Sequence, residues 1–382
     1  MDTRGAERLK MVDSTTLTPL ARKALNLVDA VVDDWKYETL RGGSPNSEIY
    51  RFSGSAHSGE NIFPWSLILK IIRASEGTVD PASLRNWKRE ALAYQSGLLD
   101  DLPVGFCAPR CFGIVEQSDF EDWLWLEEVN DEIRANWSPE HYGRVAHQLG
   151  QFNGVFLKER RLPTQPWLTK GWLRAWVANA IPLIPISAEV LAHPLCSRLY
   201  PHDIYQRLLQ VWHEHDAWLS FIEHQPQTLA HMDAFRRNLL TRRDSIGDMQ
   251  IVLIDWAFLG SAALGEEIAP LVAASLFFLE FDPDQADTLD KIVFESYLEG
   301  LGKTGWQGDP RAVRFTYTAS AVLRYSIGVL GITSMLADEN RHAGIEQAIG
   351  HPLDEVVDVW TKSTRFLYKL ADEARGIFNS LH

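Results

Sequence analysis

A histidine, two aspartates and an asparagine lie close together in the second half of the sequence. His231 and Asp233 form a His-x-Asp pair in the segment LAHMDAFRRNLL, and Asn238 follows five residues after Asp233. Asp255 stands directly after the apolar run IVLI. Phosphoryl transfer from a nucleotide requires metal ions, a cation on the phosphates and a carboxylate beside the incoming hydroxyl. Because carboxylate and amide oxygens are also the donors that Mg²⁺ prefers, these residue types favour phosphoryl-transfer chemistry.

Hydrophobic periodicity predicts the elements that position these side chains. Residues 203–222 have the apolar spacing of a helix, which places Asp233 in a loop between a long helix and a short strand. Loop side chains of this kind can reach solvent and substrate. The apolar run before Asp255 predicts a strand, and the end of a strand would hold that carboxylate rigidly.

The first part of the chain predicts an opening helix and a small antiparallel sheet. Helical spacing covers residues 16–32 and again residues 80–99, where Pro81 stands near the start and Gly97 near the end. Runs rich in β-branched and aromatic residues, bounded by turn residues, predict strands over residues 35–43, 47–54, 65–72, 110–117 and 122–129.

The rest of the chain is predicted to be mainly helical. Only two short strands, around Asn238 and Asp255, interrupt the helical periodicity. That periodicity covers residues 138–157, 203–222, 264–279, 309–336 and 352–374. We therefore predict an α+β protein with a small antiparallel-sheet N-lobe over residues 1–128 and a larger helical C-lobe over residues 129–382. A ligand is expected between two such lobes.

Composition and charge exclude some classes of function. A formal net charge of −14 and a pI near 5.3 argue against binding to nucleic acid. The N-terminal segment lacks the apolar stretch of a signal peptide, and the longest apolar run, residues 268–281, is too short to cross a bilayer. Three cysteines (Cys107, Cys111 and Cys196) cannot build a disulfide framework, and no second Cys/His pair follows at the spacing of a metal site. We expect a cytoplasmic protein without a nucleic-acid or membrane partner.

The pattern His231-x-Asp233-x4-Asn238, followed by Ile254-Asp255-Trp256, resembles the aminoglycoside phosphotransferase and choline kinase family. The resemblance implies a bilobal protein-kinase-like fold, with ATP or alternatively GTP as the phosphoryl donor and Mg²⁺ as the metal. It implies that Asp233 is the catalytic base or hydroxyl-orienting residue. Asn238 and Asp255 would be Mg²⁺ ligands, and His231 would support the loop.

The N-lobe contains counterparts of other parts of that family's site, and the resemblance spans roughly residues 35–280. Lys70 ends the segment WSLILK, where the family places the lysine that contacts the α- and β-phosphates, and Glu90 matches the glutamate that braces this lysine. The segment LRGGSPNSEIYRF matches the loop that covers the phosphates, and LWLEEV resembles the hinge strand whose backbone meets the base. The nucleotide-binding residues implied in these two segments are Gly42, Gly43, Ser44 and Asn46 in the loop, and Leu126, Glu127, Glu128 and Val129 in the hinge.

Two positions near Asp233 differ from the related patterns. Met232 replaces the glycine that the family commonly has between the His and the Asp, so the backbone there is less permissive. Phe235 stands where protein kinases have a phosphate-contacting lysine. We expect Arg236 or Arg237 to supply that positive charge instead.

Two acidic features allow more than one interpretation. Glu266 and Glu267 open a predicted helix, where carboxylates favour the positive end of the helix dipole, so we expect them to act as capping residues. The segment EQSDFEDWLWLEEVNDE contains eight acidic residues and no Lys or Arg. Such a run usually forms solvated surface. Alternatively, it would attract cationic molecules to the hinge.

These observations lead to one leading function and several alternatives. The leading one is an ATP- and Mg²⁺-dependent phosphotransferase that moves the γ-phosphoryl group to a hydroxyl of a small molecule, such as an aminoglycoside or another antibiotic. The alternatives are a kinase of a metabolic small molecule, such as a choline-like amino alcohol or a sugar, and a noncatalytic nucleotide-binding protein of the same fold. No Ala-Pro-Glu segment follows Asp255, which disfavours a protein kinase.

Overall fold

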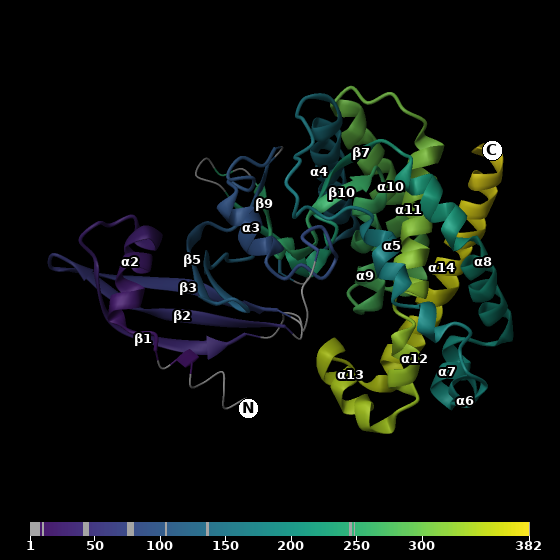
Figure 1. The fold of residues 1–382 in the computed structure, drawn as a ribbon, viewed down its shortest axis with the longest axis horizontal. Coiled ribbons are helices and arrows are strands. Elements are labelled where there is room, and N and C mark those ends of the chain that lie inside the picture. Colours follow the sequence, from purple (N-terminus) through teal and green to yellow (C-terminus); the bar gives the residue numbers. More distant parts are fainter. Residues whose placement is uncertain are drawn as a thin grey trace.

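Two lobes make up the protein in the computed structural model, which describes residues 8–9, 11–40, 46–74, 80–103, 105–134, 137–243, 247 and 249–381 (Figure 1). The N-terminal lobe, on the left of Figure 1, is built on a sheet, and the C-terminal lobe, on the right, consists mainly of helices. The predicted α+β class, with a small antiparallel-sheet lobe and a larger helical lobe, is confirmed.

A five-stranded antiparallel sheet forms the N-terminal lobe. The strands are β1 Val31–Thr39, β2 Ser47–Ser58, β3 Asn61–Arg73, β5 Cys111–Ser118 and β6 Glu121–Glu127, adjacent in the order β1-β2-β3-β6-β5. Successive side chains of a strand point to opposite faces. In β3, Leu67 and Leu69 therefore pack in the core beneath helix α2 Ser14–Leu25, whereas Ile68 and Ile72 pack on the face of helix α3 Arg89–Gln95. The same alternation directs Lys70 toward α3.

Helix α2 is shorter than its periodicity predicts. It begins after Asp13, whose carboxylate accepts a hydrogen bond from the amide of Thr16. It ends at Leu25 because Asn26 adopts the left-handed conformation, with φ 56°. The predicted helix was therefore wrong from residue 26 onward, and the residues from Val31 onward form β1.

Helix α3 occupies only part of the predicted segment 80–99. The residues before it form turns, in which the Asp80 side chain accepts a hydrogen bond from the amide of Ala82 and the Asn86 side chain donates one to the carbonyl of Pro81. Short polar side chains that bond to nearby backbone in this way compete with helix formation. Glu90 lies in the first turn of the remaining helix and contacts Lys70 of β3.

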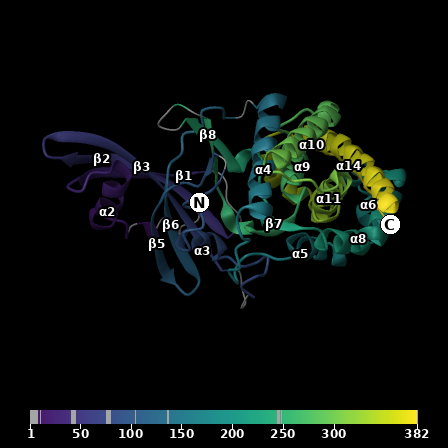
Figure 2. The same cartoon turned by 90° about the horizontal axis from the view of Figure 1, so that it is seen from above.

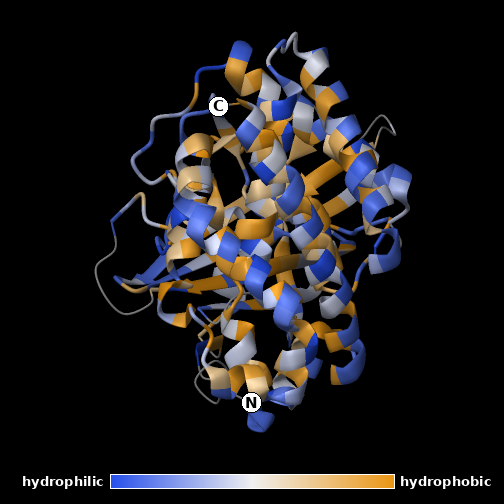
Figure 3. Ribbon diagram, turned by 90° about the vertical axis from the view of Figure 1, so that its right-hand side faces the viewer, coloured by the Kyte–Doolittle hydropathy of each residue, from blue (hydrophilic) through white to orange (hydrophobic). Residues whose placement is uncertain are grey.

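The C-terminal lobe is a helical assembly in which α4 and α10 lie side by side, with α9, α11 and α14 next to them (Figure 2). The helix bounds are α4 Pro139–Lys158, α5 Trp172–Ala178, α6 Ala188–Ala192, α7 Pro194–Leu199, α8 His202–Glu223, α9 Ala269–Phe277, α10 Ala286–Lys303, α11 Pro310–Val322, α12 Gly331–Leu336, α13 His342–Ile349 and α14 Leu353–Leu381. A π-helical turn, Leu323–Ile327, follows α11. Hydrophobic and hydrophilic residues alternate along these helices, as expected for helices with one buried face (Figure 3).

The segment from α11 to α12 contains a long apolar stretch. Residues Pro310–Leu336 are long and apolar enough to span a bilayer by composition, but 61% of the most apolar window is buried inside the protein. Helix α11 packs along α14 and α9. A buried core helix accounts for this composition.

Two small sheets lie where the lobes meet and position the residues singled out by the sequence. Strands β4 Phe106–Cys107, β9 Met249–Leu253 and β8 Leu239–Arg243 form one, and β7 Gln227–Ala230 pairs with β10 Gly260–Ala263 in the other. Strand β4 pairs in parallel with β9, so this part of the predicted N-lobe joins a sheet of the C-terminal lobe. Strand β6 ends at Glu127, next to the boundary predicted at residue 128.

Candidate active site

The loop between β7 and β8 holds Asp233 and Asn238 against each other. The Nδ2 atom of Asn238 donates to the carbonyl oxygen of Asp233 at 3.0 Å and to its Oδ2 at 2.9 Å. Both bonds use the amide nitrogen, so neither occupies the amide oxygen. The amide of Ile254 donates to the carbonyl of Asn238 at 3.0 Å, which brings the loop beside the segment that carries Asp255.

Asp255 follows β9 and connects this loop to the N-terminal lobe. Its backbone adopts a left-handed conformation, with φ 62°, which Asp tolerates better than most residues. The Nζ atom of Lys70 donates to Oδ1 of Asp255 at 2.9 Å and lies 2.5 Å from Oε2 of Glu90. The structure therefore joins the lysine and glutamate of the N-terminal lobe to the aspartate of the C-terminal lobe.

Burial and charge act against each other in this triad. Burial lowers the pKa of Lys70, but the carboxylates of Asp255 and Glu90 outweigh it and hold the pKa above its ordinary value. Burial raises the pKa of Glu90, and Lys70 only partly offsets this. At Asp255 the lysine outweighs burial and keeps the pKa low. Two carboxylates and one ammonium give the triad a net negative charge, which suits a divalent cation.

His231 links the two halves of the motif as a neutral imidazole. Burial lowers its pKa to about 4. Its Nε2 lies 2.9 Å from the carbonyl of Ile254, and its Nδ1 accepts a hydrogen bond from the amide of Asp233 at 3.3 Å. A single Nε2–H tautomer satisfies both contacts. This geometry agrees with the supporting role expected for His231.

Glu267 holds the start of the same loop through backbone amides. Its carboxylate accepts hydrogen bonds from the amides of His231 at 2.8 Å and Met232 at 3.2 Å, and the residue is 1% exposed. The neighbouring Glu266 accepts from the amide of Ala263. Burial raises the pKa of Glu267 to about 8 and that of Glu266 to about 7. The expectation that these two residues cap a helix is wrong, because their carboxylates bind amides outside the helix that they open.

Arg324 is a site residue that the sequence did not reveal. It lies in the π-helical turn and donates to Oδ1 of Asp233 at 2.5 Å and to the carbonyl of Met232. Burial raises the pKa of the Asp233 carboxyl despite the opposing charge of Arg324. Asp233 and Arg324 are 91 positions apart, and no local pattern marks the arginine.

The two arginines expected to contact phosphate lie against a different partner. Arg236 and Arg237 both pair with Oε1 of Glu280, at 2.5 Å and 2.6 Å, and the glutamate side chain is 5% exposed. The guanidinium of Arg237 also lies 4.3 Å from the ring centre of Phe278. Both arginines thus form ion pairs within the protein. Their contact with phosphate stays a prediction.

Parts of the predicted nucleotide site are described and parts are not. Gly42, Gly43 and Ser44 lie outside the described residues, whereas the carbonyl of Asn46 accepts a hydrogen bond from the amide of Arg73. Hinge residue Leu126 is buried opposite Ile68 of β3. The other hinge residues lie next to it in the order Glu127, Glu128 and Val129.

Most of the eight acidic residues around the hinge pair with basic neighbours. The pairs include Glu116 with Lys88, Glu121 with Arg73, Glu127 with Arg242, Glu128 with Arg51 and Glu132 with Arg243. These pairs reduce the negative charge that could attract a cation.

Asn238 and Asp255 fit a Mg²⁺ ion that a nucleotide would help to hold. Mg²⁺ usually takes one or two protein carboxylates and completes its shell with phosphate oxygens and water. The Asp255 side chain is 35% exposed, and the amide oxygen of Asn238 takes no part in the bonds to Asp233. Among the described residues, no group of three or more His, Cys, Asp or Glu side chains could hold a metal ion. Phosphate oxygens would therefore supply much of the coordination.

Comparison of the chain with solved structures identifies its fold. No protein-family model matches the sequence, and no curated protein matches it. A choline kinase from Cryptosporidium parvum Iowa II aligns over 96% of this chain and 98% of its own, with a TM-score of 0.52 and 15% identity. An ethanolamine kinase from Plasmodium vivax aligns over 95% of this chain and 93% of its own, with a TM-score of 0.51 and 12% identity. The chain has the fold of small-molecule kinases.

A third kinase of this fold has a bound nucleotide analogue and a divalent cation. This amicoumacin kinase, in complex with AMP-PNP and Ca²⁺, aligns over 94% of the chain and 96% of its own, with a TM-score of 0.50 and 14% identity. The kinase fold predicted from the sequence motifs is thus confirmed. At such low identity the likeness concerns the fold alone, and the chemistry has to be argued from the site.

Proposed function

We propose that the protein is a member of the aminoglycoside phosphotransferase and choline kinase family and transfers the γ-phosphoryl group of ATP to a hydroxyl group of a small molecule. The observation that carries this proposal is the continuous set of contacts from Glu90 through Lys70 to Asp255, and from Asp233 through Asn238 to the segment before Asp255. These residues come from both lobes and meet at their junction.

Each group has a distinct part in the transfer. The ammonium of Lys70, held by Glu90, would bind the nonreacting phosphates, and Asp255 and Asn238 would hold Mg²⁺. When bound, Mg²⁺ neutralises charge on the phosphate oxygens. The Asp233 carboxylate accepts a hydrogen bond from the acceptor hydroxyl and so aims its oxygen at the γ-phosphorus. A new P–O bond forms there, the bond to the β–γ bridging oxygen breaks, ADP leaves and the hydroxyl proton passes to Asp233.

The nature of Asp233 suits this role. The Asp233 side chain is only 18% exposed. Burial raises the pKa of its carboxyl, which makes it a better proton acceptor than a fully solvated aspartate. His231 stays neutral and contributes orientation through its two bonds. GTP is an alternative donor, because a hinge that contacts the base through backbone atoms allows either purine. We place the protein in the cytoplasm, without a membrane or nucleic-acid partner.

The test is ADP release across a panel of antibiotics, amino alcohols and sugars. With an active acceptor, Asp233→Asn should lower kcat by about 10²- to 10⁴-fold while the affinity for ATP stays within about twofold. Asp354→Asn, at an exposed position in the first turn of α14, is the matched control and should behave as the unchanged protein. ATP binding without acceptor-dependent ADP release would instead indicate a noncatalytic nucleotide-binding protein, and near-normal turnover of Asp233→Asn would reject the role of that residue.

A further inference from the structure

The π-helical turn Leu323–Ile327 directs a charged side chain at Asp233. The turn interrupts an otherwise apolar helical stretch, and Arg324 within it is 6% exposed. Single π turns inside α-helices occur frequently at functional sites. The guanidinium binds both Oδ1 of Asp233 and the carbonyl of Met232, so it holds the carboxylate and the preceding peptide together.

Aromatic side chains fix the position of that guanidinium. It lies 4.3 Å from the ring centre of Trp172 and 5.2 Å from that of Tyr325. Trp172 in turn stacks on Trp176, with ring centres 5.2 Å apart and planes within 10°, and is only 2% exposed. Trp176 donates from its Nε1 to the carbonyl of Arg324 at 3.2 Å.

Gly328, directly after the π-helical turn, leaves room for Trp176 to pack against the backbone. A Cβ atom on Gly328 would lie 2.2 Å from Nε1 of Trp176, so only glycine fits there. Trp176 can therefore approach the turn closely enough to bind the carbonyl of Arg324. These contacts fix the position of Arg324, which is buried and does not lie at the surface.

This arrangement occupies a carboxylate and an aromatic face that could otherwise bind a cation beside the acceptor hydroxyl. An ammonium group in a protein site is held by a carboxylate or by the open face of an aromatic ring. Arg324 already pairs with the carboxylate of Asp233 and already covers Trp172. The nearby carboxylates of Glu266 and Glu267 are buried and bound to backbone amides. Asp255, a further acidic neighbour of Asp233, pairs with Lys70. A cationic acceptor would therefore meet the guanidinium of Arg324, while these carboxyl groups of the described chain already have partners.

Resting on the proposed function, we propose that Arg324 is the positioning residue of Asp233 and that it also determines acceptor class. It holds the carboxylate toward the acceptor, and it selects an uncharged alcohol or polyol over a compound with an ammonium group next to the hydroxyl. Neutral sugars and polyols are the substrate class that this charge balance fits.

The test compares acceptors that differ only in charge. ADP release is measured with choline and with its carbon isostere, in which a tert-butyl group replaces the trimethylammonium group, and then with ethanolamine and propanol. Glucose and glycerol are added as uncharged acceptors outside these matched pairs. We expect kcat/KM for each uncharged compound to exceed that of its cationic counterpart by about tenfold or more. Choline accepted as well as its isostere would overturn the selection.

Variants of Arg324 separate positioning from general stability. Arg324→Gln should lower kcat by about 10²-fold at unchanged affinity for ATP and should reduce the preference for uncharged acceptors, whereas Arg324→Lys should restore part of kcat because it keeps the charge. Arg198→Gln, which removes an exposed arginine of α7, should change neither quantity. If Arg324→Gln does not bind ATP, the Arg324→Lys protein provides the test, with a lowered kcat and an unchanged KM for ATP.

Each result bears on one claim. A kcat that is unchanged or raised in both Arg324 variants would overturn the positioning role, and a raised kcat would show that the arginine blocks Asp233. ADP release from no acceptor in any protein, with ATP still bound, would reject the proposed function itself and this inference with it.

Discussion

Glu267 should make the stability of the protein fall as the pH rises, because its carboxyl is buried where a charge is costly. Its pKa rises from the ordinary 4.5 to about 8. Between those values the folded state keeps a proton that the unfolded state has released, so the free energy of unfolding decreases with pH. This contribution is fully present below pH 4.5 and is lost as the pH passes through about 8. The interval corresponds to about 5 kcal/mol at most.

The substitution Glu267→Gln removes the titratable carboxyl group but keeps nearly the same side-chain shape. A glutamine oxygen can still accept from one of the amides of His231 and Met232, while its NH₂ group faces the other. The lost bond costs about 1–3 kcal/mol. We therefore expect the variant to be less stable than the unchanged protein near pH 5, equally stable near about pH 6, and more stable near about pH 9.

Urea unfolding followed by tryptophan fluorescence measures this crossing, since the chain has 14 tryptophans. Glu266, whose pKa is also raised, contributes the same slope to both proteins, so the difference between them reports Glu267 alone. Glu299→Gln, at an exposed position of α10, serves as the matched control and should follow the unchanged protein. Parallel curves for Glu267→Gln and the unchanged protein, with no crossing, would refute the reasoning.

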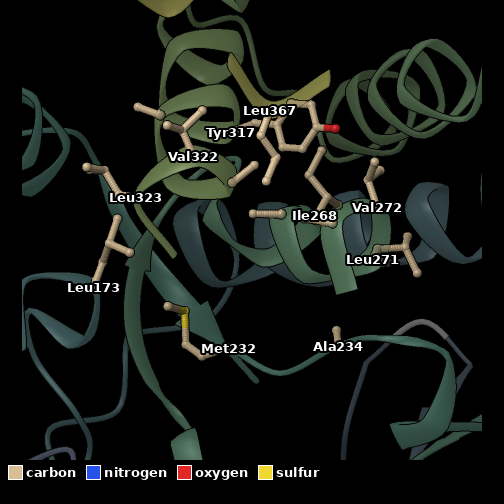
Figure 4. Close-up of a cluster of buried hydrophobic side chains, with 14 of the residues drawn as sticks. Leu173, Met232, Ala234, Ile268, Leu271, Val272, Tyr317, Val322, Leu323 and Leu367 are labelled. Carbon is tan, nitrogen blue, oxygen red and sulfur yellow. The ribbon is translucent and has the colours of Figure 1, made fainter. Parts of the chain in front are cut away.

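Two further predictions concern the supports of the site. Met232 has φ 66°, where glycine is favoured, yet its side chain is 2% exposed and lies in the buried cluster with Ala234, Leu323 and Leu173 (Figure 4). Met232→Ala and Met232→Gly should both be destabilised in urea, but the glycine variant should be the more stable of the two by about 1 kcal/mol, and the opposite order would contradict the strain argument. Arg89 is 0% exposed and donates to the carbonyls of Trp167, Ala257 and Ser83. Arg89→Met should lower the free energy of unfolding by about 3 kcal/mol, and a change below about 1 kcal/mol would show that the three carbonyls find other partners.

Residues whose role coincides with a local pattern could be predicted from the sequence. Asp233, Asn238 and Asp255 flank short apolar strands, so spacing and periodicity together placed them in loops at strand ends. Lys70 and Glu90 were implied by the family resemblance, supported by the order of a strand and a helix, and the structure joins them at 2.5 Å. Helix limits were less predictable, since Asn26 ends α2 by a backbone conformation that periodicity does not reveal.

The contacts that complete the site could not be predicted because they join distant segments. Arg324 lies 91 positions from Asp233, and Glu267 lies 36 positions from His231. In the sequence, the arginine interrupts an apolar helix and the glutamate opens one, where local rules assign a solvated or a capping role. Burial by tertiary packing changes both roles, and no local rule contains that information.

The three side chains that support the loops of the site all bind backbone groups, which explains why no sequence pattern marks them. Arg89 binds the carbonyl of Ala257 after Asp255, Glu267 binds the amides before Asp233, and Arg324 binds the carbonyl of Met232. A polar side chain that binds backbone needs only to reach a backbone donor or acceptor, so the partner can be any residue type. The guanidinium groups of Arg89 and Arg324 are charged, and hydrogen bonds to a charged group are about twice as strong as neutral ones, which lets a few of them fix loops that contain few apolar residues. Loss of such a support should therefore disturb the orientation of the two aspartates before it disturbs the sheet that holds Lys70.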